Sequence, residues 1–157
     1  HSDRETLETA VKKGAFARGF KQQVIVPEGL SGTVETLLLQ RLTGLLGMGK
    51  KAGDIVLGFD QVRDALQKKR PGSLLEAADG AEDGRSKVYF LAKALYSNVK
   101  MAGALSSEEL GVAFGRERVI HGLVRKGPIA KATELAYQRL AGFRARPELD
   151  WFPDQDR

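Results

Sequence analysis

Residues 106–124 read SSEELGVAFGRERVIHGLV, and this stretch decides which fold the chain adopts. Ser106 and Glu109 form the pattern of a capping box, which predicts that a helix begins here. Gly115 is placed to end that helix, because glycine readily takes the left-handed conformation that closes helices. The apolar run over 119–124 then predicts a strand. A short capped helix followed directly by a strand is typical of an α/β domain.

The same alternation of helix and strand continues on both sides of this stretch. Downstream, Gly127 and Pro128 start a last helix, with proline at the first helical position, where it is tolerated. Upstream, apolar residues recur at helical and strand spacings. Helical stripes run over 37–46, 59–66, 88–95 and 129–140, and strands are expected over 55–57, 73–78, 99–102 and 119–124. The pattern predicts a three-layer α/β/α sandwich with a small mixed four-stranded sheet and helices on both faces.

Three regions of different character follow one another along the chain. Residues 1–30 contain a weakly amphipathic helix and a linker with Pro27 and Gly29, which are typical of a boundary. Residues 31–143 carry the alternating elements and are expected to form the domain. Beyond residue 143 the sequence becomes charged and contains proline, so residues 144–157 are predicted to be a flexible tail.

The sequence offers no set of residues suited to catalysis. It contains no cysteine, which excludes thiol nucleophiles, cysteine-ligated metals and disulfides. His121 is the only histidine apart from His1, and within a predicted strand it is expected as a packed or edge residue. Paired acids stand at predicted helix starts, where capping explains them better than acid–base chemistry. We therefore predict that the protein is not an enzyme and has no catalytic residue, metal site or cofactor.

The distribution of positive charge predicts a polyanionic partner. The formal charge is +5, and many cations fall beside the ends of predicted elements, where side chains can reach a ligand backbone. These cations are Lys50, Lys51, Arg63, Arg85, Lys87, Arg116, Arg118, Arg125 and Lys126. The alternative is a protein-interaction or structural module whose basic surface is merely solvated. Since no apolar run is long enough to span a bilayer, a cytoplasmic protein without a membrane partner is expected, and the oligomeric state stays open.

The aromatic residues favour structured RNA over unpaired bases. Proteins that bind single strands interleave exposed aromatic rings with basic residues, so that bases can stack on them. Here Phe90 and Phe114 are placed like core residues, and only Phe59 is expected at the surface. A folded RNA, recognised by its shape and its backbone, is therefore the predicted ligand.

Two stretches resemble the ribosomal-protein-like kink-turn RNA-binding family, in particular small bacterial members that are often encoded near transcription and translation factors. The first stretch is GLLGMGKKAG at 44–53, followed by LGFDQV at 57–62, and the second is ELGVAFGRERV at 109–119. Their order and spacing match from residue 44 to residue 143. The resemblance implies a three-layer α/β/α sandwich that grips a sharply bent RNA, with a role in translation, transcription or ribosome biology.

Carried over by position, the resemblance implies two segments that contact RNA. The start of the second domain helix supplies Gly58, Phe59, Asp60 and Gln61, and the loop before the last strand supplies Glu117, Arg118, Val119 and Ile120. Archaeal and eukaryotic members carry an Asn-Glu pair and a downstream Lys where this chain has Asp60, Gln61 and Asp64. Kink-turn, ribosomal and other structured RNA therefore all stay open as ligands, contacted also through Lys50, Lys51, Arg63 and Arg116. A third reading, the RNA-recognition part of a modifying enzyme, rests on related domains that precede methyltransferases.

The segment AVKKGAFARGF at 10–20 resembles the tail of a second small bacterial nucleic-acid-binding domain, the YlxR family. The upstream Arg/Cys and Gly-Arg-Gly motifs of that family do not occur in this chain. We hypothesise that the natural protein extends further at its N-terminus. A full-length reading frame that begins at Asp3 would refute this hypothesis.

Overall fold

The structure is a computed structural model that describes residues 29–152. The helix expected within residues 1–30 and the YlxR-like segment lie outside the described residues. Within the described part of the chain, no helix has both the length and the apolar character needed to cross a membrane.

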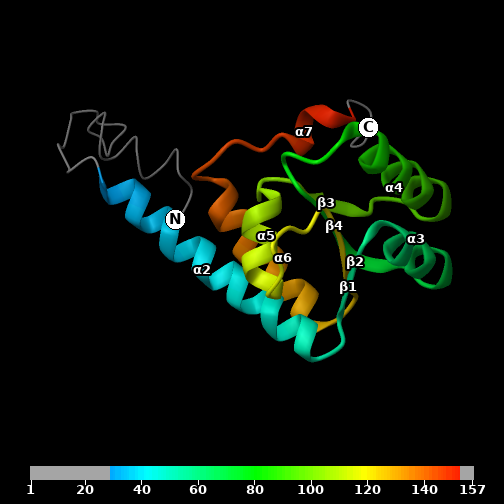
Figure 1. The fold of residues 1–157 in the computed structure, drawn as a ribbon, viewed down its shortest axis with the longest axis horizontal. Helices are drawn as coiled ribbons and strands as arrows, with labels where there is room; N and C mark the ends of the chain where they lie inside the picture. The colour runs from blue at the N-terminus through cyan, green and yellow to red at the C-terminus, as the bar shows by residue number, and fades with distance from the viewer. Residues whose placement is uncertain (1–28, 153–157) are drawn as a thin grey trace. The chain divides into compact units, whose positions relative to one another are not determined.

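The described residues alternate between helix and strand along the chain (Figure 1). The helices are α2 (Gly29–Lys51), α3 (Phe59–Lys68), α4 (Glu82–Leu95), α5 (Ser107–Phe114), α6 (Pro128–Ala141) and α7 (Glu148–Trp151). The strands are β1 (Ile55–Leu57), β2 (Pro71–Glu76), β3 (Lys100–Ala102) and β4 (His121–Arg125). This order confirms the predicted alternation, including the capping box, in which Ser106 and Glu109 satisfy each other's backbone N–H groups.

The four strands form one mixed sheet in the order β1-β4-β2-β3. β4 pairs antiparallel with both β1 and β2, and β2 pairs parallel with β3. The registers place Leu57 opposite Gly122 and Leu74 opposite Leu123. The predicted fold class, an α/β sandwich with a mixed four-stranded sheet, is therefore confirmed.

The chain divides into two compact units, one of which contains the whole sheet. The sheet unit comprises residues 43–134 and the chain from residue 146 onward, and the second unit contains residues 135–145 and the first part of α2. Within the second unit, Arg144 pairs with Glu35 at 2.9 Å, and Phe143 is fully buried.

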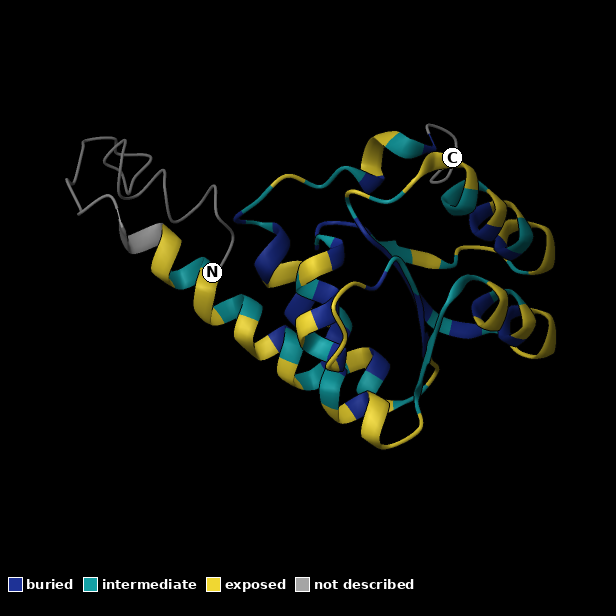
Figure 2. Cartoon of the chain, in the orientation of Figure 1, coloured by how far each residue is buried: buried dark blue, intermediate teal, exposed yellow. Residues whose placement is uncertain are grey.

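Helices cover both faces of the sheet within the sheet unit (Figure 1). On one face, α3 and α4 pack over Leu74 and Leu123, and Val62, Leu66 and Val88 complete this core. In Figure 2 the buried residues of α3 and α4 lie on the sides of these helices nearer the sheet, and the exposed residues lie on the sides away from it. The other face is covered by α5, by the C-terminal end of α2 and by the N-terminal end of α6.

Close helix packing explains why the helix continues beyond its expected apolar stripe of residues 37–46 into a glycine-rich segment. In the structure α2 continues without interruption through Gly47 and Gly49 to Lys51. A Cβ atom on Gly49 would lie 2.9 Å from the Ile129 side chain of α6, and one on Gly47 would lie 3.1 Å from the Ala113 carbonyl oxygen of α5. Tertiary packing therefore outweighs the low helix propensity of glycine here.

Several local expectations differ from the structure. Phe90, expected in the core, is 57% exposed and packs edge-on against Tyr89 and Phe152. Leu135 belongs to the apolar stripe expected over 129–140, together with Ile129, Ala132, Ala136 and Leu140, but it is 55% exposed. The buried stripe runs instead through Thr133, Ala136, Tyr137 and Leu140. The predicted flexible tail of residues 144–157 contains α7, and Phe152 behind it is stacked on Tyr89 with ring centroids 3.9 Å apart.

Candidate nucleic-acid interface

The start of α3 is fixed to the first residue of β4. Gly58 precedes α3 with a φ of 103° and a ψ of 149°, a conformation that is essentially restricted to glycine. Its backbone N–H donates to the His121 carbonyl oxygen at 3.0 Å, and its own carbonyl oxygen accepts the first helical hydrogen bond, from Val62, at 2.9 Å. The Gln61 side chain occupies the place where a Cβ atom on residue 58 would stand. Only glycine therefore fits this junction without strain.

The loop from Gly115 to Ile120 is held by backbone hydrogen bonds along its length. Gly115 ends α5 in the left-handed conformation with a φ of 69°. Arg116 N–H donates to the Gly111 carbonyl at 2.9 Å, and Val119 N–H donates to the Ser107 carbonyl at 3.0 Å. The Ile120 carbonyl accepts from Ala77 at 2.9 Å. The loop is thus tied to both α5 and the end of β2.

The structure brings the two predicted RNA-contacting segments to the same end of the sheet. Because β1 and β4 are antiparallel, the residues that follow β1 lie beside the residues that precede β4. The exposed side chains there are Asp60, Gln61, Glu117 and Arg118, whereas Phe59, Gly58 and Ile120 are half-buried. Val119 is 5% exposed, so this residue can offer a ligand little besides its backbone.

The cations predicted to contact RNA do not all lie at the end of the sheet where the two predicted segments meet. Lys50 donates from Nζ to the Phe114 carbonyl at 3.3 Å, which places it at the end of α5 beside Arg116. Lys50 and Lys51 precede β1, whereas Gly58 follows it, so these lysines lie at the opposite end of the strand. Lys51 and Arg116 are exposed and have no side-chain partner among the described residues.

Two further arginines of the predicted interface are engaged within the protein. Arg118 lies 3.9 Å from the carboxylate of Glu108, in a pair exposed on both sides, which contributes little to stability. Arg63 stacks over the Phe59 ring, with its guanidinium carbon 5.3 Å from the ring centroid. Its Nε atom is buried without a hydrogen-bond partner among the described residues. Arg63 therefore supports Phe59 from within α3.

Buried Glu76 and half-buried His121 form an acid–base pair that lies beside the starts of α3 and α4. The register of β2 and β4 places Glu76 opposite His121, and the His121 Nδ1 atom lies 2.8 Å from Glu76 Oε1. The His121 ring also packs against Phe59, with centroids 5.4 Å apart. A Cβ atom on Gly84, in the first turn of α4, would lie 3.0 Å from this ring. His121 is therefore a packed residue, as predicted, and it joins four elements.

Burial raises the pKa of the Glu76 carboxyl above its ordinary value, whereas the hydrogen bond and charge of His121 and the charge of Arg85 act to lower it. Burial dominates because removing a carboxylate from water disfavours its ionised form. A raised pKa means that the folded protein holds the proton of Glu76 more tightly than the unfolded chain does. The resulting stability is fully present below pH 4.5 or so and is lost as the pH rises through the raised value.

The Glu76→Gln variant tests this electrostatic account. We expect the free energy of unfolding of the wild type, minus that of the variant, to decrease steadily as the pH is raised from about 4.5 toward neutrality. Urea unfolding of both proteins across this range measures the difference. Glu82→Gln, which removes an exposed carboxylate from the start of α4, serves as the control for the loss of one acidic group. A difference for Glu76→Gln that stays constant or grows with pH would contradict the assignment.

Sequence reasoning missed the residues that hold the interface in place. Glu76, Gly84 and Gly111 lie next to His121 or to the loop only because of strand register and helix packing, which no local pattern reveals. A Cβ atom on Gly111 would lie 2.5 Å from the Arg116 carbonyl oxygen and 2.6 Å from that of Glu117. The one available signal for Gly111 was a glycine inside a short, strongly capped helix, where glycine is otherwise unfavourable.

Comparison with known proteins identifies the fold but no family. No protein-family model matches the sequence, and no curated protein matches it. A protein of unknown function from Bacillus halodurans has a similar structure, with a TM-score of 0.57 and 16% sequence identity, covering 62% of this chain and 97% of that one. A 15.5 kD RNA-binding protein from Giardia lamblia is similar with a TM-score of 0.51 and 15% identity, covering 68% of this chain and 90% of that one. At these identities the likeness establishes a shared fold alone.

Proposed function

We propose that this protein binds structured RNA through the start of α3 and the loop from Gly115 to Ile120, and that it performs no chemistry of its own. The observation that carries the proposal is the hydrogen bond from Gly58 N–H to the His121 carbonyl, which fixes the start of α3 to the residue that directly follows the loop from Gly115 to Ile120. The Giardia lamblia protein, whose fold is similar, is an RNA-binding protein. That likeness in fold supports the choice of ligand class.

The physical properties of these segments suit the sugar–phosphate backbone of RNA. The start of α3 presents unpaired backbone N–H groups and the positive end of the helix dipole, both of which favour phosphate. Gly58 has no side chain, so a ligand backbone can approach closely. The exposed cations Lys51 and Arg116 extend the contact surface beyond α3. Asp60 opposes phosphate at the helix start, so the proposal names structured RNA as the ligand class without requiring recognition of a kink-turn.

Binding of the protein to three RNAs across a salt series tests the proposal. The RNAs are a bent kink-turn, a straight duplex of equal length and total ribosomal RNA. Because phosphate contacts release counterions, we expect affinity to fall steeply as the salt concentration rises. Preference for the bent RNA would indicate that the family's mode of recognition operates despite Asp60, Gln61 and Asp64, and equal affinities would indicate general backbone contact. Absence of binding at low salt would refute the proposal and favour the protein-interaction alternative.

A further inference from the structure

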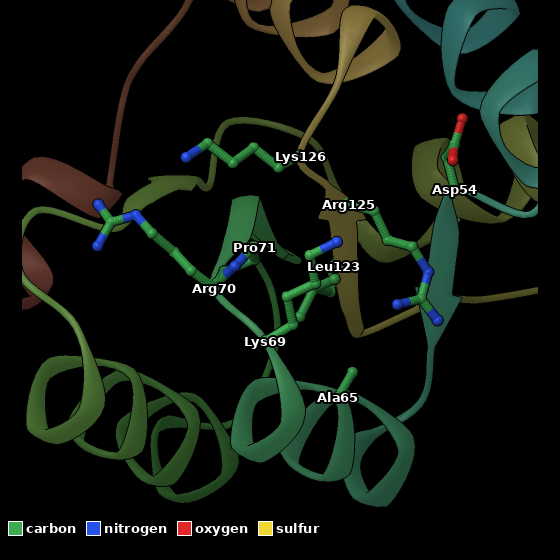
Figure 3. A pocket seen from close by; sticks show the side chains of 8 residues that line it. All are labelled: Asp54, Ala65, Lys69, Arg70, Pro71, Leu123, Arg125 and Lys126. Atoms are coloured by element: carbon green, nitrogen blue, oxygen red, sulfur yellow. The ribbon is translucent and has the colours of Figure 1, made fainter.

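A basic hollow lies at the end of the sheet opposite to the start of α3 (Figure 3). It has a volume of about 180 Å³ and is lined by four cations, which are Lys69, Arg70, Arg125 and Lys126. Asp54 is its one acidic residue, and it lies at the edge of the group in Figure 3. The four cations come from the end of α3, the start of β2 and the end of β4. The fold, and not a single charged run, therefore concentrates this charge.

None of the four cations is neutralised by a carboxylate among the described residues. Elsewhere in the sheet unit, exposed cations such as Lys68, Lys87 and Lys100 pair with Asp64, Asp83 and Glu134 respectively. Within the hollow, the side chains of Lys69 and Lys126 have no hydrogen-bond or ion-pair partner in the described part of the chain. Uncompensated positive charge at one place attracts anions, because it creates a local positive potential.

The two arginines are held in position by backbone carbonyl groups, which leave their charge intact. Arg70 donates to the Ser97 carbonyl at 2.6 Å and lies over the Tyr96 ring, with its guanidinium carbon 5.8 Å from the centroid. Arg125 donates from Nε to the Gly53 carbonyl at 3.3 Å, and its two terminal NH₂ groups have no partner among the described residues. Preorganised guanidinium groups lose little side-chain entropy when they bind phosphate.

We propose that this hollow binds phosphate groups of a nucleic-acid backbone and forms a second contact surface for RNA. The volume is well above the roughly 10–15 Å³ that one water molecule requires by the same measure, which leaves space for a phosphate group with its five non-hydrogen atoms. The N-terminus of α6 begins at Pro128, two residues after Lys126, and adds the positive end of its dipole. The apolar side chain of Leu123 lines the hollow beneath the cations.

The second surface shares its ligand class with the proposed function but none of its residues. β4 joins the two surfaces, because His121 at its start faces α3 and Arg125 at its end lines the hollow. Five residues of strand separate the two surfaces by about 13 Å along the strand. A single folded RNA that contacts both ends of the sheet would therefore bind more tightly than one that contacts either end alone.

The double variant Lys69→Ala/Lys126→Ala tests this inference by its effect on the salt dependence of RNA binding. The probe is the straight duplex, and the measured quantity is the slope of the logarithm of affinity against the logarithm of salt concentration. We expect the slope to fall in magnitude by about two and the affinity to fall about tenfold or more at low salt, since two phosphate contacts are lost. The matched control Lys93→Ala/Arg139→Ala removes two exposed cations elsewhere and should leave the slope nearly unchanged.

The outcomes separate this inference from the proposed function. An unchanged slope in Lys69→Ala/Lys126→Ala overturns the second surface, even if Arg116→Glu weakens binding and the proposed interface survives. A reduced slope in the hollow variant, with no effect of Arg116→Glu, supports the hollow and refutes the proposed interface. Equal losses in the control variant show an effect of net charge alone and overturn the inference. A wild type that binds no RNA at low salt refutes both.

Discussion

Gly111→Ala is expected to lower the free energy of unfolding by about 2–3 kcal/mol, because the added methyl group collides with backbone that cannot rotate away. Its Cβ atom would stand 2.5 Å from the Arg116 carbonyl oxygen and 2.8 Å from the Glu117 carbonyl carbon. Hydrogen bonds from Arg116 to Gly111 and from Val119 to Ser107 hold the loop against α5, so the loop must move or the helix must shift. Denaturant unfolding measures the loss.

Gly44→Ala is the matched control for this prediction, since it makes the same change in a helix where, apart from the adjoining helix backbone and the two chain neighbours, no atom lies within 4 Å of the new Cβ. Alanine has the higher helix propensity, so this variant should be as stable as the wild type or more stable by up to about 1 kcal/mol. Similar stabilities for Gly111→Ala and the wild type would show that the loop does not pack on α5 as described.

Lys51→Glu/Arg116→Glu is expected to weaken binding to structured RNA by about a hundredfold at moderate salt and to reduce the salt slope by about two. Each substitution replaces attraction to phosphate by repulsion. Both side chains are exposed and have no partner among the described residues. The free energy of unfolding should therefore change by less than about 0.5 kcal/mol. Lys50 and Arg118 are left intact, because they contact Phe114 and Glu108 within the protein.

The control for the charge reversal is Lys93→Glu/Arg139→Glu, which alters the net charge equally on α4 and α6. We expect a small, sequence-independent loss of affinity from this control, as the change in net charge alone dictates. Binding by Lys51→Glu/Arg116→Glu that matches the control would place RNA elsewhere on the protein. Fluorescence anisotropy with the straight duplex suffices for both variants.

Much of the fold was predictable because its elements carry strong local signals. The capping box at Ser106 and Glu109, the glycine that ends α5 and the proline that starts α6 each specify a helix boundary by local hydrogen bonding or backbone geometry. α3 was likewise predicted from the spacing of its apolar residues, and its buried residues are Val62, Ala65 and Leu66. Local energetics and tertiary packing agree at these places.

The remaining features depend on contacts between residues far apart in the sequence. The continuation of α2 through Gly47 and Gly49 requires α5 and α6 to be present, since these helices fill the space that side chains would occupy. The burial of Phe114 and the exposure of Phe90 follow from which face of each helix meets the sheet. Helical spacing fixes an apolar stripe only to within a residue or so, which is why Leu135 was assigned to the wrong side of α6.

The candidate interface was predictable in part. The two segments themselves were identified from the sequence, and the strand pairing places them together. Arg125 and Lys126 were identified as cations that can reach a ligand, but their meeting with Lys69 and Arg70 in one hollow was not predicted. The pairing of Glu76 with His121 was not predicted either, because both arrangements arise from the register of β2 against β4. The packing of the whole sheet sets the strand register, so the local sequence at either residue does not predict which residue it will face.

The most direct test of the central claim is to map which backbone amides of the protein change in NMR spectra when structured RNA is added. We predict the largest shifts at Gly58, at Gln61 and in the loop over 116–120, with a second, smaller group around Lys69 and Lys126. Shifts confined to other parts of the described chain, with the start of α3 and this loop unaffected, would contradict the proposed interface.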